Sequence, residues 1–281
     1  MVAGFKPKLD LTSSAREYEN PSGLFLILLD TLKIQTRILL GALIQVLLCS
    51  VLPMRLAITP ACLLLFHSII TTVLQVRSPR SSHFQDDVVF GRATSQLPSG
   101  DGSYGTQPAK DSIVFFNLGI QYNHPLGVFS QGAYEVSRYY MKMEKNLLAR
   151  REELGLLSIS KWHASERQSN NTLIITFYFK DVESIHKFAQ EELHREALDF
   201  YHKAKHEHIG VFHETMIVPA KNYENVYVNC RPVLMGTSAV KLDDEKSGGE
   251  SWATPLVNAN HPNLKTQYAR LSRHENGAAK E

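Results

Sequence analysis

The sequence predicts an α+β protein, built as an apolar helical hairpin followed by a small domain of strands and helices. Three observations predict this class. Between Ile38 and Val76 the only formally charged side chain is Arg55. A polar stretch follows, and residues 111–236 then interleave β-branched and aromatic runs with two amphipathic helical segments. The chain of 281 residues is long enough for one or two domains.

The charge distribution favours a membrane surface over a nucleic acid as the partner. The 30 Lys and Arg residues nearly balance the 28 Asp and Glu residues, and the chain has no basic stripe of the kind that phosphate backbones need. Eight basic but only four acidic residues lie in residues 1–80, beside the apolar segment, where anionic lipids would attract them. The three cysteines exclude a disulfide scaffold and a Cys-rich zinc module.

The apolar segment reads as two membrane-associated helical arms. Residues 56–76 match the length of about 20 residues that crosses the hydrocarbon core. Residues 38–52 are shorter, and extending them backwards would bury three charges at about 3 kcal/mol each. We therefore expect residues 23–37 to form an interfacial amphipathic piece and Pro53 to break the arms. The alternative, a buried hairpin of a soluble domain, would normally show a polar face.

The flanking charges predict the orientation of this hairpin. A secretory signal is excluded because the apolar stretch begins too late, is too long and lacks a cleavage site. More basic side chains flank the arms than occupy the turn, so the positive-inside rule places both ends and the C-terminal domain in the cytosol, at the endoplasmic reticulum membrane. The flanking residues are Lys33, Arg37, Arg77 and Arg80, against Arg55 in the turn.

The order of elements in the second part is that of the ferredoxin-like βαββαβ fold, with one further strand. The expected strands are Ser112–Gln121, Leu156–Ala164, Thr172–Lys180, His208–Pro219 and the additional Asn225–Pro232, and the expected helices are Ala133–Leu154 and Val182–His206. The whole chain then divides into a polar N-terminus (1–22), the hairpin (23–76), a flexible linker (77–110), the ferredoxin-like domain (111–236) and a flexible tail (237–281).

Histidines supply the main candidates for chemistry. Six of the 12 histidines fall between residues 186 and 213, but His202 and His206 lie on the polar side of the expected helix and have no third ligand at a recognised spacing, so no metal site is predicted. His194 lies at the edge of the apolar face, where it either reaches a pocket or bonds the backbone as a boundary residue. In the strand HIGVFHETMIVP, His213 and Glu214 interrupt apolar rows on opposite faces, and one of these rows can instead face solvent.

The remaining candidates are polar or aromatic residues whose alternative role is structural. Asn225, Tyr227 and Asn229 share one side of the last strand, where they line either a site for an oxygenated substrate or a solvent face. Trp162 is a core candidate, and His124 in the loop NHPLG is placed to close a pocket mouth. The chain contains no nucleophile elbow, phosphate loop or dinucleotide-binding glycine pattern.

These residues resemble a fungal family of antibiotic-biosynthesis-monooxygenase-like proteins, one member of which is the fumagillin-pathway monooxygenase. The resemblance covers residues 111–236 and rests on His194-Arg195, His213-Glu214, Tyr227 and Asn229 among others. It departs after His194, where aromatic residues are common in the family. The segments that carry it read NHPLGV, YFKDVESIHKFAQEELHREALDFY, HIGVFHETMIVP and YENVYVN.

The resemblance implies a homodimeric α+β barrel and a monooxygenase that uses O₂ without metal, flavin or haem. The expected substrate is a lipophilic polyketide or terpenoid of secondary metabolism, which the enzyme deprotonates and hydroxylates. His213 or His194 would then be the base, with Glu214 orienting a histidine or pairing with Arg195. The substrate-binding residues would be Asn229, Tyr227, Asn225, Trp162, His124 and Arg195.

Two alternatives remain open from the sequence. The same barrel superfamily includes haem-dependent aldoxime dehydratases and haem-degrading enzymes, in which His194 or His213 would be an axial ligand. The protein can also be a non-catalytic, membrane-tethered ligand carrier.

Overall fold

The structure is a computed structural model, and it describes residues 4–18, 34–78, 83–164, 172–243 and 250–279. The chain forms two compact units. One contains the N-terminal residues together with residues 89–165 and 171–281, and the other contains residues 22–88 and 166–170.

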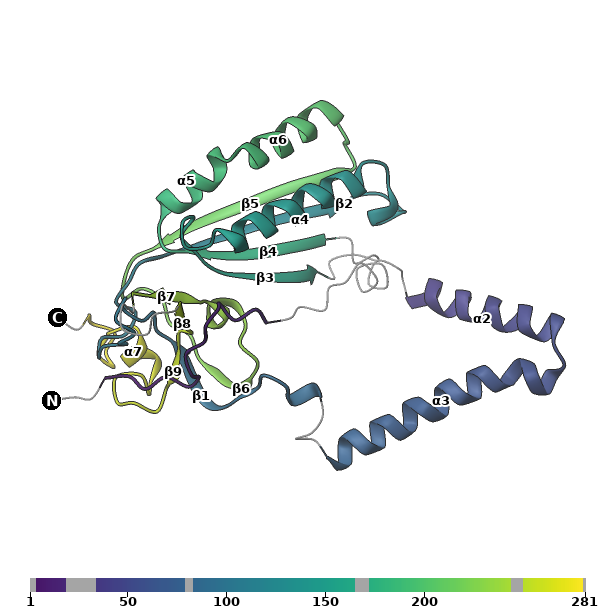
Figure 1. Ribbon diagram of the computed structural model, residues 1–281, viewed down its shortest axis with the longest axis horizontal. Coiled ribbons are helices and arrows are strands. Elements are labelled where there is room, and N and C mark those ends of the chain that lie inside the picture. Colours follow the sequence, from purple (N-terminus) through teal and green to yellow (C-terminus); the bar gives the residue numbers. More distant parts are fainter. Residues whose placement is uncertain (1–3, 19–33, 79–82, 165–171, 244–249, 280–281) are drawn as a thin grey trace. The chain divides into compact units, whose positions relative to one another are not determined.

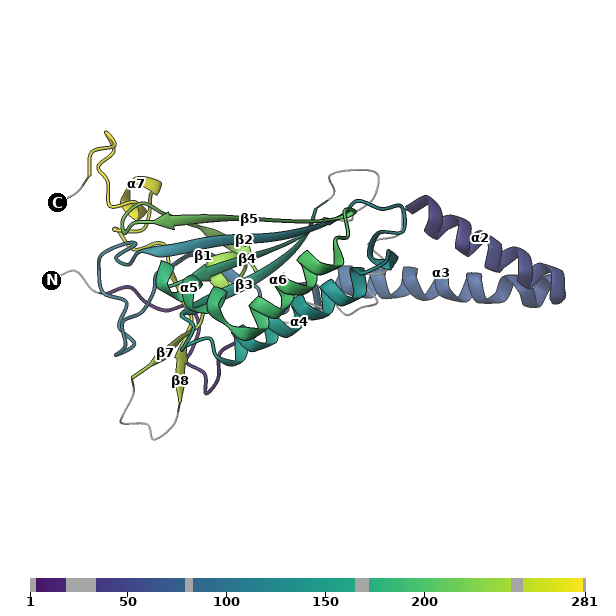
Figure 2. The same ribbon diagram turned by 90° about the horizontal axis from the view of Figure 1, so that it is seen from above.

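The ferredoxin-like order is confirmed by the strand topology of the larger unit. Its four-stranded sheet has the order β3-β4-β2-β5, and all three neighbouring pairs are antiparallel. The helices α4, α5 and α6 lie along one face of this sheet (Figures 1 and 2). The elements are β2 (Ile113–Tyr122), α4 (Ala133–Ala149), β3 (Leu156–Ala164), β4 (Thr172–Phe179), α5 (Val182–Gln190), α6 (Glu192–Ala204) and β5 (Ile209–Val218), with the short helix η3 (Gly127–Phe129) before α4.

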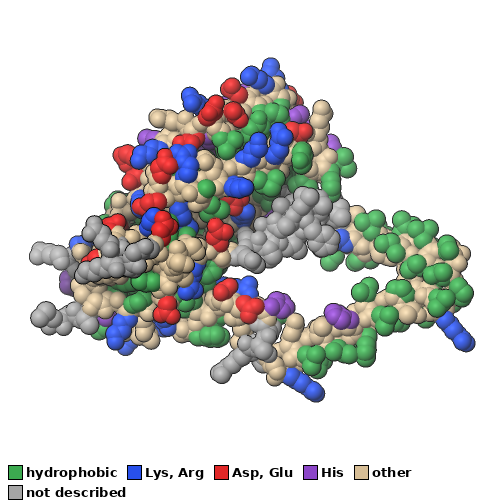
Figure 3. All heavy atoms as spheres, viewed as in Figure 1, with side chains coloured by type: hydrophobic (Ala, Val, Ile, Leu, Met, Phe, Trp, Pro, Cys, Tyr) green, Lys and Arg blue, Asp and Glu red, His purple; other side chains and the backbone are tan. Residues whose placement is uncertain are grey.

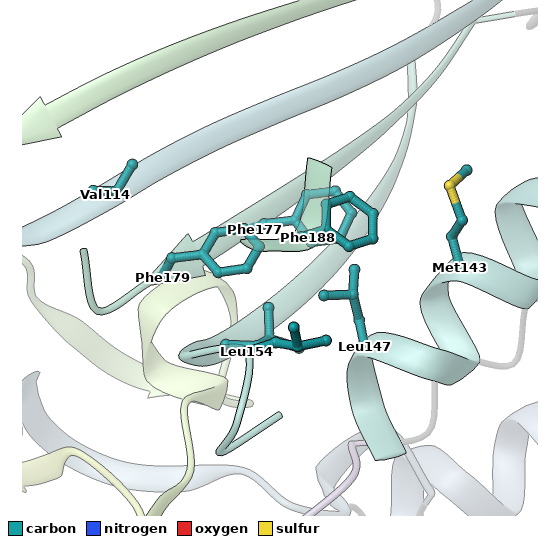
Figure 4. Packing of buried hydrophobic residues seen from close by; sticks show 8 residues of the cluster. Val114, Met143, Leu147, Leu154, Phe177, Phe179 and Phe188 are labelled. Carbon is teal, nitrogen blue, oxygen red and sulfur yellow. The ribbon is translucent and has the colours of Figure 1, made fainter. Parts of the chain in front are cut away.

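The hydrophobic core fills the layer between this sheet and its helices. Because side chains alternate along a strand, every second residue of β2, beginning with Val114, points into the layer. Phe177 and Phe179 of β4 enter it beside Leu147 of α4 and Phe188 of α5 (Figure 4). Phe179 has no exposed surface. At one end of the opposite sheet face, Ile113 and Tyr178 pack in a cluster with Met235. The rest of this face, which we call the open face, carries Trp162, Phe212 and Met216, all of which are exposed.

The helix expected over Val182–His206 is two helices. Glu191 separates α5 from α6, and its ψ of 142° is extended rather than helical. Its carboxylate accepts hydrogen bonds from the Arg150 guanidinium, with Arg150 Nη1 at 2.6 Å from Oε2. This contact joins the kink to the turn that follows α4. Helix α4 itself ends at Ala149 rather than at Leu154 as expected. Helical periodicity alone carried no signal for this break.

The expected flexible linker and flexible tail are corrected by a second sheet. Its strand order is β6-β1-β9, and a separate pair, β7-β8, lies nearby in sequence. The additional strand expected at Asn225–Pro232 is the shorter β6, and it pairs with β1 rather than joining the first sheet. The elements are β1 (Val89–Ser95), β6 (Tyr227–Cys230), β7 (Val240–Leu242), β8 (Ser251–Ala253), β9 (Leu256–Asn258), η4 (Leu234–Thr237) and α7 (Gln267–Arg270).

Composition does not predict this second sheet, because polar residues occur in its strands. Thr94 and Ser95 are fully buried. Thr94 Oγ1 donates a hydrogen bond to the Asn225 carbonyl, and the Ser95 amide donates one to Asn225 Oδ1. A buried polar group costs little when it is paired, so a Ser- and Thr-rich segment can form a central strand. The linker and the tail are predicted from their polar composition. A polar residue indicates exposure to solvent only where it has no hydrogen-bond partner within the protein.

The N-terminal residues belong to the same folded body. Pro7 forms a bridge with Val257 of β9, and Thr12 forms one with Trp252 of β8. Phe5 is buried in a cluster with Tyr104, Val257 and Leu264. The polypeptide before the hairpin and the last third of the domain are therefore packed together.

The smaller unit is a pair of helices whose side chains are almost all exposed. Helix α2 (Ile34–Val51) has no buried residue and α3 (Met54–Arg77) has only Ala57, so hydrophobic side chains cover the pair (Figure 3). Pro53 immediately precedes α3, as the predicted break requires, and Gln45 Nε2 donates to the Ala57 carbonyl at 3.1 Å. Both helices are long and apolar enough to cross a membrane. Of the interfacial piece expected over residues 23–37, residues 23–33 lie outside the described residues, and residues 34–37 form the start of α2. A short helix, η2 (His83–Gln85), follows α3.

Candidate functional site

His213 lies on the helix-facing side of the sheet. It pairs with Leu118 of β2, whose side chain packs against the core, and cross-strand partners share a face. Its ring centroid is 5.8 Å from that of Phe116. As β5 is the edge strand, His213 keeps an exposed side while its other side contacts the apolar layer.

His194 enters the same layer from the first turn of α6. Its ring centroid lies 5.3 Å from that of Phe188, and its Nδ1 lies 3.1 Å from the Ala189 carbonyl oxygen. Because a carbonyl oxygen only accepts, this hydrogen bond places the proton of the neutral imidazole on Nδ1. Nε2 is then the basic atom and is free to take a proton.

The two imidazoles influence one another electrostatically. Burial lowers the pKa of His194 below its ordinary value, the hydrogen bond to Ala189 opposes this, and the nearby His213 lowers the pKa further. Burial and the neighbouring ring of His213 thus both favour the neutral form of His194. The arrangement keeps a neutral imidazole available near neutral pH, which is the state that a general base requires.

Glu214 does not belong to this histidine pair. The pleat directs it to the open face, opposite Asn117 of β2, while His213 points to the helices. Asn117 Oδ1 accepts a hydrogen bond of 2.8 Å from Thr176 Oγ1, so the middle of the open face has a polar row. The expectation that Glu214 orients a histidine or pairs with Arg195 is therefore wrong for this geometry, because Arg195 lies on α6, on the other side of the sheet, where it is exposed.

Asn225, Tyr227 and Asn229 hold the second sheet together rather than meeting the histidines. Asn225 Oδ1 accepts from the Ser95 amide at 2.6 Å. Asn229 Oδ1 accepts from the Gly91 amide at 2.7 Å, and its positive φ of 50° fits the bulge between β1 and β6. Tyr227 is buried, and burial raises the pKa of its phenol. The predicted substrate-binding row is thus placed in a structural role.

Trp162 and His124 also lie apart from the histidine pair. Trp162 is exposed on the open face, in register with Ile174 of β4. His124 lies in the loop after β2, where its Nδ1 accepts from the Leu126 amide and its ring packs 5.3 Å from that of His208.

Three tyrosines that pack in the core layer were missed from the sequence. Tyr122 of β2, Tyr140 of α4 and Tyr201 of α6 converge in the layer between the sheet and its helices. A signal for one of them was present, since Tyr140 follows Ala133 and Val136 at the helical spacing of the core face. Sequence alone could not show that the three phenols meet.

A cavity of about 410 Å³ opens elsewhere in the larger unit. It is lined by the turn after α4 and by Glu17, Lys241, Glu250 and Trp252. None of the predicted site residues lines it. Because its walls are charged, this cavity resembles a surface groove lined by salt bridges more than a binding site for a lipophilic substrate. Among the described residues, no group of three or more His, Cys, Asp or Glu side chains is arranged to hold a metal ion.

The comparisons with known proteins decide the family. The model of the monooxygenase af470-like family matches residues 113–235. Monooxygenase af470 of Aspergillus fumigatus is 44% identical over 273 residues, which covers 97% of this chain and 99% of the relative. The chain belongs to the monooxygenase af470-like family. Its class of enzyme is accordingly a monooxygenase, an oxidoreductase.

The solved structures that are similar to this chain match only part of it. An aldoxime dehydratase has a TM-score of 0.40 at 14% identity, with 52% of this chain and 39% of that chain covered. SnoaB, a cofactor-independent oxygenase from Streptomyces nogalater, has a TM-score of 0.26 at 13% identity, with 38% and 91% covered. The strand order β3-β4-β2-β5, and not these overlaps, defines the fold.

Proposed function

We propose that this family member is a membrane-anchored monooxygenase that oxidises a lipophilic carbon acid with O₂ and no bound cofactor. The observation that carries the proposal is the histidine pair, with the basic Nε2 of His194 and the ring of His213 beside Phe116 and Phe188. An apolar layer disfavours water and suits a polyketide or terpenoid skeleton, while an imidazole that stays neutral removes the proton.

Electron balance narrows the reaction beyond the expected hydroxylation. Inserting one oxygen of O₂ into a C–H bond and releasing the other as water requires two electrons from a separate donor. When the substrate is the sole donor, a CH₂ group beside a carbonyl becomes C=O and the second oxygen leaves as water. The base takes one proton, the carbanion reduces O₂ and forms a C–O–O bond, and loss of the second C–H proton breaks the O–O bond. The proposed product is therefore a ketone.

A deletion strain tests this function. The metabolites of the producing fungus are compared with those of a strain that lacks this gene. We expect a missing product that differs from an accumulated precursor by the gain of one oxygen and the loss of two hydrogens. Gain of an oxygen alone would show that an outside reductant takes part, and unchanged metabolites would contradict the enzyme proposal. A Soret band in the purified protein would favour the haem-dependent alternative instead.

We propose that α2 and α3 form a two-pass membrane anchor at the endoplasmic reticulum with the catalytic domain in the cytosol. Nearly every side chain of the pair is exposed, and transferring such apolar surface from water into lipid is favourable. Residues before the pair bridge to β8 and β9, so the segments that precede and follow the helix pair belong to one folded unit. This supports an even number of crossings.

Membrane fractionation tests the anchor. The protein is expected to stay in the pellet after alkaline carbonate extraction, and a protease added to intact microsomes is expected to cut the domain. Release by carbonate would contradict a spanning hairpin. Protection of the domain would place it in the lumen and overturn the orientation.

We propose that the open face is the homodimer interface. Trp162, Phe212 and Met216 expose a row of large apolar side chains there, which a monomer rarely leaves uncovered. Gly119 makes this row flat, since any Cβ at that position would clash with the Phe212 ring. Trp162→Glu is expected to convert the detergent-solubilised dimer to a monomer in light scattering coupled to size-exclusion chromatography. Tyr134→Glu, on the exposed side of α4, is the matched control, and a monomeric wild-type protein would contradict the interface.

A further inference from the structure

Tyr140 carries a hydroxyl for which the described fold supplies no partner. Its Oη is fully buried and has no hydrogen-bond partner among the described residues. The neighbouring phenols differ in this respect. Tyr122 Oη shares a hydrogen bond of 2.9 Å with Ser137 Oγ, and Tyr201 Oη donates to the Ile209 carbonyl at 2.8 Å.

The missing partner has an energetic cost that folding does not explain. A buried donor without a partner costs about 1–3 kcal/mol, whereas a phenylalanine would fill the same space without that cost. Burial and the two neighbouring phenols raise the pKa of Tyr140, so the hydroxyl keeps its proton at every physiological pH. The side chain is therefore a permanent donor aimed into an apolar layer.

The position of Tyr140 links the tyrosines to the histidine pair. It packs against both neighbouring core clusters, one with Phe116 and Leu118 and one with Tyr122 and Ile209. Along β2, Leu118 is the cross-strand partner of His213, and Ile120 and Tyr122 follow on the same face. The phenol of Tyr140 thus enters the same helix–sheet layer as the two imidazoles.

We propose that the Tyr140 hydroxyl is the donor that binds the carbonyl oxygen of the substrate and stabilises the enolate formed on deprotonation. A ketone or enolate oxygen only accepts hydrogen bonds, which matches a hydroxyl with no other acceptor. This inference rests on the proposed function, and it specifies the substrate as a compound with a ketone oxygen next to the CH₂ group that is oxidised. The hydrogen bond strengthens as charge develops on that oxygen, so it acts mainly on kcat.

The test exploits opposite effects on stability and activity. Full-length Tyr140→Phe and Tyr201→Phe are purified in detergent and assayed with the precursor that accumulates in the deletion strain. Tyr140→Phe is expected to keep or raise Tm, because an unpaired buried hydroxyl is removed, and to lower kcat by about 10²–10³-fold. Tyr201→Phe removes a hydroxyl that already has a partner, so it is expected to lower Tm and leave kcat within about 2-fold.

Each contrary outcome has a defined meaning. A Tyr140→Phe protein that is as stable and as active as wild type would overturn the inference and leave the proposed function intact. A drop in Tm equal to that of Tyr201→Phe would show that the hydroxyl has a structural partner, such as a trapped water, and would also overturn it. If wild type does not convert the precursor, the proposed function fails, and the inference fails with it.

Discussion

Replacing His213 with Ala is expected to lower the rate of substrate oxidation by about 10²–10⁴-fold, the range that general-base catalysis contributes. The imidazole faces the apolar layer beside Phe116, and no carboxylate shares its side of β5. A stopped assay of precursor consumption with full-length protein in detergent measures the effect. His202→Ala, an exposed histidine of α6, is the matched control and is expected to retain the wild-type rate. Equal activity in His213→Ala and wild type would remove His213 from the mechanism.

The same variant is expected to change the pH dependence. The pKa of His194 is lowered first by burial and then by His213, so its neutral form persists to a pH below the ordinary histidine value. Because the folded state then binds fewer protons than the unfolded chain, stability is full above the ordinary pKa and declines as the pH falls toward the lowered one. Removing His213 removes the repulsion, so the pKa of His194, followed by NMR of its imidazole, is expected to rise in His213→Ala. An unchanged pKa would show that His213 does not act on His194.

Replacing Phe179 with Ala is expected to destabilise the larger unit by about 3–5 kcal/mol. The ring is fully buried in the centre of the core, between the sheet and the turn that follows α4, and stacks 6.1 Å from Phe177 (Figure 4). The surrounding strands are fixed by their ladders, so they cannot close the cavity that the missing ring would leave. Chemical denaturation of the detergent-solubilised protein, followed by tryptophan fluorescence, measures the loss.

Phe129 provides the control for this stability prediction. It lies in η3 with more than half of its surface exposed, and Phe129→Ala is expected to change the unfolding free energy by no more than about 0.5 kcal/mol. A small effect of Phe179→Ala, comparable with that of the control, would mean that the layer relaxes around the cavity and is less closely packed than the structure indicates.

Periodicity and turn residues predict the first sheet because its determinants are local. The strands that begin at residues 113, 156, 172 and 209 start within one residue of the expected positions, and the order of elements allows few other folds. The faces of His213 and Glu214 follow from strand alternation alone. The second sheet has no such local signature, since it pairs residues more than 100 positions apart through Asn225 and Asn229.

The candidate site is predictable only in its parts. His194 and His213 are candidates from the sequence because a histidine in or beside an apolar row is unusual, but their electrostatic coupling arises only in the folded layer. Tyr140 could not be singled out from the sequence, because an aromatic residue on the core face of a helix is common. Its missing hydrogen-bond partner is a property of the assembled layer, and no spacing in the sequence encodes it.

The pairing of residues 7 and 12 with residues 257 and 252 has a consequence for biosynthesis. On the ribosome the N-terminal segment emerges first, and its partner strands emerge only after more than 200 further residues have been added. By then α2 and α3 have already met the insertion machinery. The segment must therefore wait, unpaired and on the cytosolic side in the proposed orientation, until the second sheet closes at the end of synthesis. A mutation or fusion that translocates these first residues would leave β8 and β9 without their N-terminal partners, even though every residue of the layer between the first sheet and its helices is unchanged.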